Sequence, residues 1–309
     1  LMTYLPRLRW LCLSSAILLC FCGTRAGAES TPAPMVIKHY NQGYTPLLRL
    51  YLTDVLKLTL EKTTDEYGPF ELQYFNETMS ANRSKLETEK GMHIDLLFSP
   101  HWRGHFVDPS KVIPVEFPVV NGMLGLRNMI TTEKTRAQLE KTESMMSFKQ
   151  LVAGMGPWID AEILTANQIE VVEAQTFEAL FPMLIRGRFD YIPLSMLDAH
   201  TTLTTRKIDF PGIALSHEIS VFYPLPFYLY VNARKPELAE RLKEGVETAL
   251  ADGSIDNLFS QHFFYVRPEL QGKKRKLVVL QNPLISAEQN AFYLQQFLQR
   301  YDGGFEILE

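Results

Sequence analysis

Cysteine is almost absent from this chain of 309 residues, and all three cysteines lie within its first 22 positions. Beyond them the chain can form no disulfide, and it offers no thiolate as a nucleophile or a metal ligand. Long apolar runs are missing too, because after position 28 no apolar stretch approaches the roughly 18 residues that a membrane-spanning helix needs. With 46% hydrophobic and 21% charged residues, the composition is otherwise that of a globular protein.

The short motifs of common enzymes are also missing. The sequence contains no G-x-S-x-G, no P-loop, no H-E-x-x-H and no G-x-G-x-x-G after a strand. His101 and His105 have the spacing of helical metal ligands, with Asp108 nearby. However, Pro100 precedes them and Gly104 lies between them, so a regular helix is not expected there. We therefore expect no enzyme, no metal site and no cofactor.

The charge balance disfavours nucleic acid as a partner. The chain has 31 basic and 35 acidic residues, and its first 28 positions hold three of the arginines and no acid. Without that segment, 28 basic residues stand against 35 acidic ones. A protein with this excess of acid is a poor match for nucleic acid or for an anionic membrane. The basic run at 272–276 is interpreted as a solvated turn before the last strand.

The N-terminus has the three regions of a secretory signal peptide. Arg7 and Arg9 form a basic region, positions 10–22 are apolar, and Ala-Gly-Ala at 26–28 fits a cleavage site. The sequence therefore predicts a cleaved leader over 1–28 and a periplasmic location. An uncleaved anchor fits less well because the apolar region is too short to span a bilayer. A lipoprotein also fits less well, because large residues precede the cysteines where a lipobox has small ones.

Strand and helix patterns alternate along the rest of the chain, which predicts an α/β fold with mainly parallel sheets. Thr45 as an N-cap and Pro46 in the first turn predict a helix after the first strand. The polar stretch 129–147 indicates a boundary between two such patterns. Strand patterns lie at 35–40, 70–75, 93–99, 150–156, 169–174, 188–194, 227–233 and 273–281, and further helical patterns at 80–91, 158–167, 176–187 and 235–253.

Several segments together resemble the family 3 periplasmic solute-binding proteins. The stretch 236–263, "PELAERLKEGVETALADGSIDNLFSQHF", is similar to their closing pair of helices around a D-G-S turn. The stretches 151–167 and 177–193 are similar to strand-helix and "helix–G-R-x-D" segments of their second lobe. The stretch 223–239 is similar to the strand on which their chain re-enters the first lobe. The chain is thereby identified as a divergent member that resembles the amino-acid-binding branch.

This resemblance implies the two-lobed type II periplasmic-binding-protein fold. Each lobe would be a mainly parallel sheet flanked by helices, and two crossover strands would join the lobes. The first lobe would hold 31–127 and 231–309, and the second lobe 128–230. A small polar ligand, amino-acid-like or an organic acid, would bind in the cleft between them, as ligands do at the carboxyl ends of parallel strands.

The resemblance also implies two charged ligand contacts. The family pairs a first-lobe arginine with the ligand carboxylate, and Arg103 is its nearest counterpart here; the alternative is a solvent-exposed surface arginine. The family's amino-group anchor falls on Ser195, and the next acid is Asp198. Either Asp198 takes the anchoring role or the ligand is not an ordinary α-amino acid, and the second reading is slightly favoured. Asp198 could instead be an N-cap.

Four aromatic residues complete the candidate ligand site. The resemblance implies that Tyr40 and Tyr44, after the first strand, wall the ligand, although they could simply cover the sheet edge. Trp102 and Trp158 each follow a predicted strand and could face the cleft, with ordinary packing as the alternative. Gly-x-Gly at 154–156, just before a predicted helix, could present free amides to an anion.

We expect an exported, monomeric binding protein that presents its closed form to an ABC permease. A periplasmic sensor module that reports the ligand to a membrane receptor is the main alternative. An enzyme built on the same two lobes is a third possibility, for which the motif search gives little support. In each case ligand would stabilise the closed state by contacting both lobes at once.

Overall fold

The structure is a computed structural model that describes residues 33–271 and 274–309. The predicted leader at 1–28 lies outside the described residues. Within them, no helix has the length and apolar character needed to cross a membrane.

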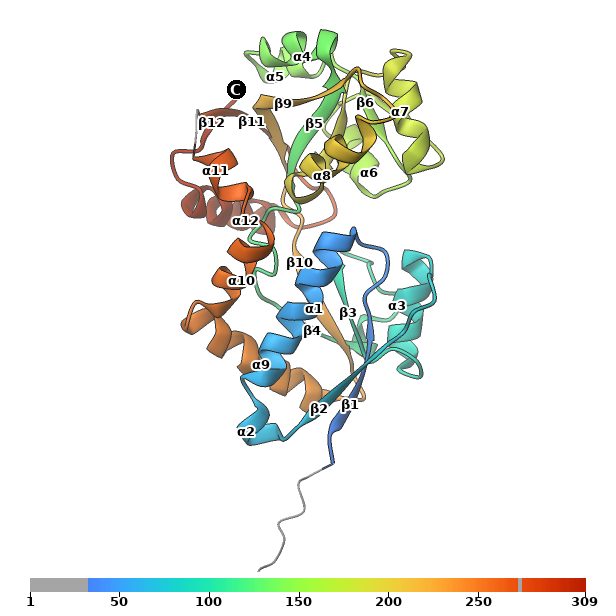
Figure 1. The fold of residues 1–309 in the computed structure, drawn as a ribbon, viewed down its shortest axis with the longest axis vertical. Coiled ribbons are helices and arrows are strands. Elements are labelled where there is room, and N and C mark those ends of the chain that lie inside the picture. Colours follow the sequence, from blue (N-terminus) through green and yellow to red (C-terminus); the bar gives the residue numbers. More distant parts are fainter. Residues whose placement is uncertain (1–32, 272–273) are drawn as a thin grey trace, which may run out of the picture. The chain divides into compact units, whose positions relative to one another are not determined.

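The described chain alternates helices and strands (Figure 1). The strands are β1 Met35–Tyr40, β2 Phe70–Tyr74, β3 Leu96–Pro100, β4 Val112–Val115, β5 Leu126–Thr132, β6 Ala153–Met155, β7 Val171–Glu173, β8 Ile192–Ser195, β9 Ile213–Phe222, β10 Phe227–Asn232, β11 Arg275–Val279 and β12 Phe305–Ile307. The helices are α1 Pro46–Glu61, α2 Thr64–Tyr67, α3 Ala81–Lys90, α4 Glu133–Glu140, α5 Met145–Phe148, α6 Asp160–Ala166, α7 Phe177–Ile185, α8 Met196–Arg206, α9 Pro236–Ala251, α10 Ser254–His262, α11 Val266–Leu270 and α12 Ala287–Arg300. A short 3-10 turn, Pro109–Lys111, precedes β4.

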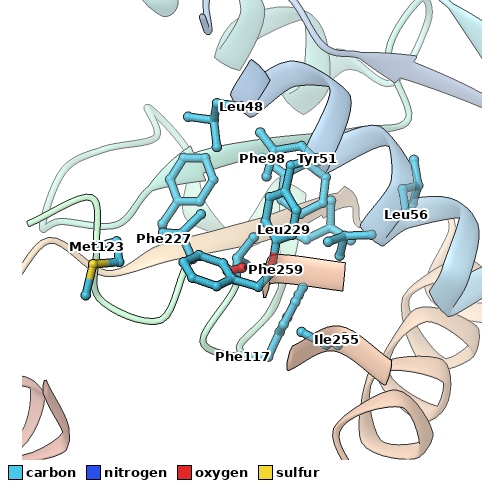
Figure 2. Packing of buried hydrophobic residues seen from close by; sticks show 14 of the residues in the cluster. Leu48, Tyr51, Leu56, Phe98, Phe117, Met123, Phe227, Leu229, Ile255 and Phe259 are labelled. Carbon is cyan, nitrogen blue, oxygen red and sulfur yellow. Dashed lines mark hydrogen bonds between the residues drawn. The ribbon is translucent and has the colours of Figure 1, made fainter. Parts of the chain in front are cut away.

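The first sheet has the strand order β2-β1-β3-β10-β4. β1 runs parallel to β2 and β3, whereas β10 runs antiparallel to its neighbours β3 and β4. Helices α1, α9 and α10 bury their apolar sides against one face of this sheet, in the core cluster that Figure 2 shows in part. Tyr51 of α1 lies in that cluster and donates a hydrogen bond to the Val119 carbonyl at 2.5 Å. The buried ring therefore satisfies its polar group inside the core.

The second sheet has the strand order β12-β11-β9-β5-β8. Here β5 is the antiparallel strand, next to β9 and β8. The pair β6-β7 continues from β8 through a parallel bridge between Ala153 and Tyr191. Successive β5 residues serve opposite faces: Met129 packs with α5 and α6, and Ile130 packs with α7 and α8. Each sheet thus has four strands in one direction and one in the other, which confirms the mainly parallel α/β prediction.

One crossover carries the chain from the first sheet to the second, and another carries it back. The first, 116–125, leads from β4 into β5, and the second, 223–226, leads from β9 into β10. They touch at Gly125, where an added Cβ would lie 2.2 Å from the Tyr223 carbonyl oxygen. Only glycine permits so close a backbone approach. The antiparallel strands β5 and β10 are the two that follow these crossovers.

The chain passes from the first sheet to the second a further time, between α10 and α11. This differs from the expected lobe boundaries. Residues 231–309 were all assigned to the first lobe, but β11 pairs in parallel with β9, and β12 pairs with β11. The C-terminal β11-α12-β12 unit therefore belongs to the second sheet. The sequence predicted the strand at 273–281, but a single apolar strand carries no signal for which of two sheets it will join.

The stretch 249–263 folds as its pattern predicts. α9 ends at Ala251, Gly253 adopts a left-handed conformation with φ of 75°, and α10 begins at Ser254. Ile255 and Phe259 are buried against the first sheet. The D-G-S turn thus reverses the chain so that both helices cover one core.

Gly245, in the middle of α9, should not tolerate a methyl group. An added Cβ would lie 2.0 Å from the Thr59 carbonyl oxygen of α1, and a backbone atom cannot move aside as a side chain end can. Although alanine favours helix, we expect Gly245→Ala to lower the free energy of unfolding by about 1–3 kcal/mol. Urea denaturation measures this, with Lys243→Ala at an exposed α9 position as the control. A Gly245→Ala protein as stable as the wild type would contradict the close packing of α1 and α9.

Candidate functional site

The carboxyl ends of the parallel strands gather loop residues from both sheets. In the first sheet, β1 and β3 end before 41–45 and 101–108, and in the second sheet β6 and β8 end before 156–159 and the start of α8. Ligands of open α/β sheets bind at such ends. The candidate site is therefore sought where side chains from the two sets of strand ends meet.

A buried charged cluster lies at the strand ends of the second sheet. An Nη atom of Arg127 forms an ion pair with Oδ1 of Asp160, and the Tyr223 hydroxyl donates to the same oxygen. The guanidinium carbon also lies 4.9 Å from the centroid of the Tyr223 ring. Arg127, Asp160 and Tyr223, called here the arginine cluster, are all buried. The Nε of Arg127 has no hydrogen-bond partner among the described residues.

The fold brings the arginine cluster together from three separate segments. Arg127 is the second residue of β5, opposite Val221 of β9 and Ser195 of β8. Tyr223 directly follows β9, and Asp160 begins α6, where the positive end of the helix dipole favours a carboxylate. Each side chain thus projects from the same edge of the second sheet.

Asp198 connects this edge to the first sheet. Its Oδ1 accepts a hydrogen bond of 2.7 Å from the hydroxyl of Thr45, which precedes α1. Burial raises the pKa of the Asp198 carboxyl, while the hydrogen bond from Thr45 and the positive charge of Arg127 act against this increase. Burial by itself lowers the pKa of the Arg127 guanidinium. The negative charges of Asp160 and Asp198 raise it by more, so that its pKa lies above the ordinary value. Asp198, Thr45 and the arginine cluster therefore form one electrostatic unit, called here the candidate site.

The N-cap residues of α1 and α8 behave differently from what the sequence suggests. Ser195, not Asp198, is the N-cap of α8, where its hydroxyl accepts from the Leu197 amide at 3.2 Å and donates to the Met123 carbonyl. The N-cap alternative for Asp198 is therefore wrong. Thr45 sits at the N-cap position of α1 but makes no capping bond with its side chain. Its hydroxyl donates to Asp198 instead, and Asp198 lies in the first turn of α8.

Tyr40, the last residue of β1, and Tyr44, in the loop that follows it, lie in packed positions. The Tyr40 hydroxyl bonds to the Met79 backbone, and its ring is buried. The Tyr44 hydroxyl donates to the Phe98 carbonyl, and its ring meets the Phe227 ring edge-on with centroids 5.9 Å apart. Both hydroxyls are thus occupied within the protein. A role in ligand binding stays a prediction for both.

The structure does not bring Arg103 and Trp102 to the arginine cluster. The Arg103 side chain is exposed and forms no ion pair with any described residue, while its amide donates to the Leu284 carbonyl at 3.0 Å. The Trp102 ring packs on the His105 ring at 4.2 Å, with the Lys85 ammonium 5.7 Å from its centroid. Their predicted contacts with a ligand remain untested.

Trp158 lies just before α6, two residues from Asp160. Its ring packs against Phe177 at 5.8 Å and near Gly156, yet 37% of the residue is exposed. Trp158 is the predicted site residue that lies nearest in sequence to a member of the arginine cluster. Its half-covered ring remains a predicted wall of the site.

The paired histidines are engaged in separate contacts. His101 Nδ1 lies 2.6 Å from the Tyr230 hydroxyl, and His105 Nε2 lies 2.8 Å from the Ser99 hydroxyl. Across 33–271 and 274–309, no group of three His, Cys, Asp or Glu side chains is arranged to hold a metal ion.

Arg127, Asp160 and Tyr223 were not predicted as site residues. The sequence signal for them is weak, because an arginine inside a strand is usually exposed and a tyrosine after a strand is unremarkable. One hint was available at 154–160: the glycine turn before a helix was recognised as a place for a negative group, and Asp160 of the same chain lies there.

Comparison with known proteins supports the fold. No protein-family model and no curated protein sequence matches this chain. A histidine kinase sensor domain with similarity to periplasmic binding proteins is 10% identical, with a TM-score of 0.51 over 75% of this chain and 97% of its own. The periplasmic VFT2 domain of Bordetella pertussis BvgS is 15% identical, with a TM-score of 0.50 over 73% and 92%. The ancestral amino acid-binding protein AncCDT-1, a precursor of cyclohexadienyl dehydratase, is 11% identical, with a TM-score of 0.51 over 74% and 95%.

At such identities these likenesses concern the fold and not the ligand. The chain has the α/β fold of the type II periplasmic binding proteins.

Proposed function

We propose that the protein binds a small polar ligand with a cationic group at the candidate site, between the strand ends of the two sheets. Asp198 supports this proposal most directly. Its carboxylate is half-buried at the site's edge and its internal partners are a neutral hydroxyl and the charge of Arg127, which Asp160 already pairs. The site thus holds two carboxylates against one guanidinium, and an ammonium or guanidinium group of a ligand would balance the excess.

The Arg127 Nε and the start of α6 would receive the polar remainder of the ligand. An amine or an amino-acid-like compound fits this arrangement better than an organic acid, because a second anion would add to the excess negative charge. Ligand entry requires the Thr45–Asp198 hydrogen bond to break, since it spans the two edges. The ligand would then replace it by contacts to both sheets and so favour the closed state.

We further propose that the protein is exported to the periplasm and acts as a monomeric substrate-binding partner of an ABC permease, without turning over its ligand. The fold is shared by sensor domains and by an amino acid-binding protein. Co-purification from the native membrane tests the role: a permease supports transport, and a signalling protein recovered in its place would assign a sensing role. Recovery of chemically altered ligand would contradict a binding protein without turnover.

A ligand screen tests the binding proposal. Native mass spectrometry of the purified protein would reveal a co-purified compound, and a thermal-shift panel would compare amines, amino acids, organic acids and sugars. A ligand at 100 times its Kd should stabilise the fold by about 2.7 kcal/mol. We expect compounds with an ammonium or guanidinium group to give the largest shifts. A panel in which only anions or neutral sugars shift the melting temperature would contradict the assignment of Asp198.

Asp198→Asn should weaken the best cationic ligand at least about thirtyfold, because it removes the charge that faces the ligand and keeps the shape. Isothermal titration calorimetry measures this. Asp65→Asn, an exposed acid of α2, is the matched control and should leave the affinity unchanged. Thr45→Val is the informative partner: it removes the internal donor and should leave Asp198 available, so the affinity should be kept or increased. Equal affinity in Asp198→Asn and the wild type would remove Asp198 from the site.

A further inference from the structure

A cavity of about 570 Å³ lies along the two crossovers and shares no residue with the candidate site. Its walls come from three segments: 116–122 of the first crossover, Phe222 with 224–228 around the second, and one side of α12. Its volume is within the range of cavities that hold small molecules. Because both crossovers contribute, an occupant would touch the segments that must bend if one sheet moves against the other.

Seven of the 19 residues that line the cavity are aromatic. Phe222 of β9 stacks on Phe297 of α12 with centroids 4.1 Å apart, and the hydroxyls of Tyr228 and Tyr293 are hydrogen-bonded to each other. Phe292, the neighbour of Tyr293, is 54% exposed at this cavity. A surface of ring faces and edges suits an apolar body or a cation, which the electron-rich ring faces attract.

The charge at the cavity is unbalanced. Glu116 and Arg300 are the charged residues among the described ones that line it. Arg300 is paired with Asp256, whereas Glu116 is exposed and has no ion pair or hydrogen bond within the described residues. Glu116 lines the cavity together with Tyr228 and Tyr293, and burial raises the pKa of both tyrosines, with the Glu116 charge adding to the increase. An unpaired carboxylate thus stands beside aromatic walls.

We propose that this cavity is a second binding site, specific for a small organic cation with an aromatic body, such as an arylalkylamine. The ammonium would lie between Glu116 and the tyrosine rings, and the aromatic body would pack among Phe292, Phe297 and their neighbours. An anion would meet Glu116 without a free cation to offset it. This site goes beyond the ligand site proposed around Asp198 and does not depend on it.

Calorimetric titration with phenethylamine, and with 2-phenylethanol as its uncharged counterpart, tests the proposal. At pH 7 phenethylamine is an ammonium ion, so the pair differs in charge at similar shape. The variants are Glu116→Gln, which removes the carboxylate, and Phe292→Ala, which removes part of the wall. The controls are Glu247→Gln, an exposed acid of α9 outside the cavity, and Asp198→Asn.

We expect phenethylamine to bind in this cavity with a Kd that Glu116→Gln raises about fivefold, as for the loss of a partly exposed ion pair supported by ring contacts. Glu247→Gln and Asp198→Asn should leave this Kd unchanged. 2-Phenylethanol should bind more weakly and be insensitive to Glu116→Gln, while Phe292→Ala should weaken both probes. The proposal would be overturned if phenethylamine showed no saturable binding, or if its Kd were equal in the wild type and Glu116→Gln. It would also be overturned if Asp198→Asn, and not Glu116→Gln, weakened phenethylamine binding.

Discussion

Arg127→Met is expected to lower the free energy of unfolding at pH 7 by about 3–5 kcal/mol, the usual cost of removing one partner of a buried ion pair. The reason is the carboxylate that remains. Asp160 would keep only the hydroxyl of Tyr223 in place of a guanidinium, while Asp198 would also lose a nearby positive charge. Denaturant unfolding followed by circular dichroism measures the change.

Two further variants separate the buried charge from lost packing. The double variant Arg127→Met/Asp160→Asn also removes the unpaired Asp160 charge. It should recover about half or more of the unfolding free energy that Arg127→Met loses. Arg136→Met, which removes a surface pair of 2.8 Å with Glu133, should cost less than about 1 kcal/mol. If Arg127→Met is no more harmful than Arg136→Met, the arginine cluster is not the buried charged unit described above.

The second large effect concerns acid stability and His39. This residue is fully buried in β1 beside the rings of Tyr74 and Phe98, and neither of its ring nitrogens has a hydrogen-bond partner among the described residues. Burial, only partly opposed by the backbone of Leu96, lowers its pKa to about 4. The unfolded chain, with an ordinary histidine pKa of about 6.5, therefore takes up this proton first as the pH falls.

The stabilisation due to neutral His39 is complete above about pH 6.5 and is lost between pH 6.5 and 4. The difference in pKa corresponds to about 3 kcal/mol. His39→Leu should remove that part of the pH dependence, so its unfolding free energy should fall less steeply over this range than that of the wild type. His105, whose pKa burial lowers to about 3, still contributes in the variant. His93→Gln, at an exposed histidine, should keep the wild-type slope; the same slope in His39→Leu would contradict a neutral buried imidazole.

The fold could be predicted from the sequence because its signals are local and repeated. Helix and strand periods alternate through both halves, and the D-G-S turn at 252–254 marks the end of α9 where the structure has it. The C-terminal unit was assigned to the wrong sheet for the opposite reason. β11 pairs with β9, whereas the strand's own apolar pattern fits either sheet.

The candidate site was predicted only in part because its members depend on tertiary contacts. Asp198 was named from its distance to an expected anchor, and its hydrogen bond to Thr45 joins residues from different sheets. Arg127 could not be predicted because its partners, Asp160 and Tyr223, lie far away in the sequence. The residues around it, 125–130, contain no pattern that indicates such partners. Arg103 is predicted as the nearest counterpart of the family's first-lobe arginine; its side chain is exposed in the loop after β3, and its contact with a ligand stays a prediction.

The most direct test of the binding proposal is a crystal structure with the strongest cationic ligand from the screen. We predict that its ammonium or guanidinium group lies about 3 Å from an Asp198 carboxylate oxygen, with the Thr45 hydrogen bond broken and contacts made to both sheets. A structure in which no copy of that ligand contacts Asp198 or the arginine cluster would contradict the proposed site, whether or not a copy also occupies the cavity along the crossovers.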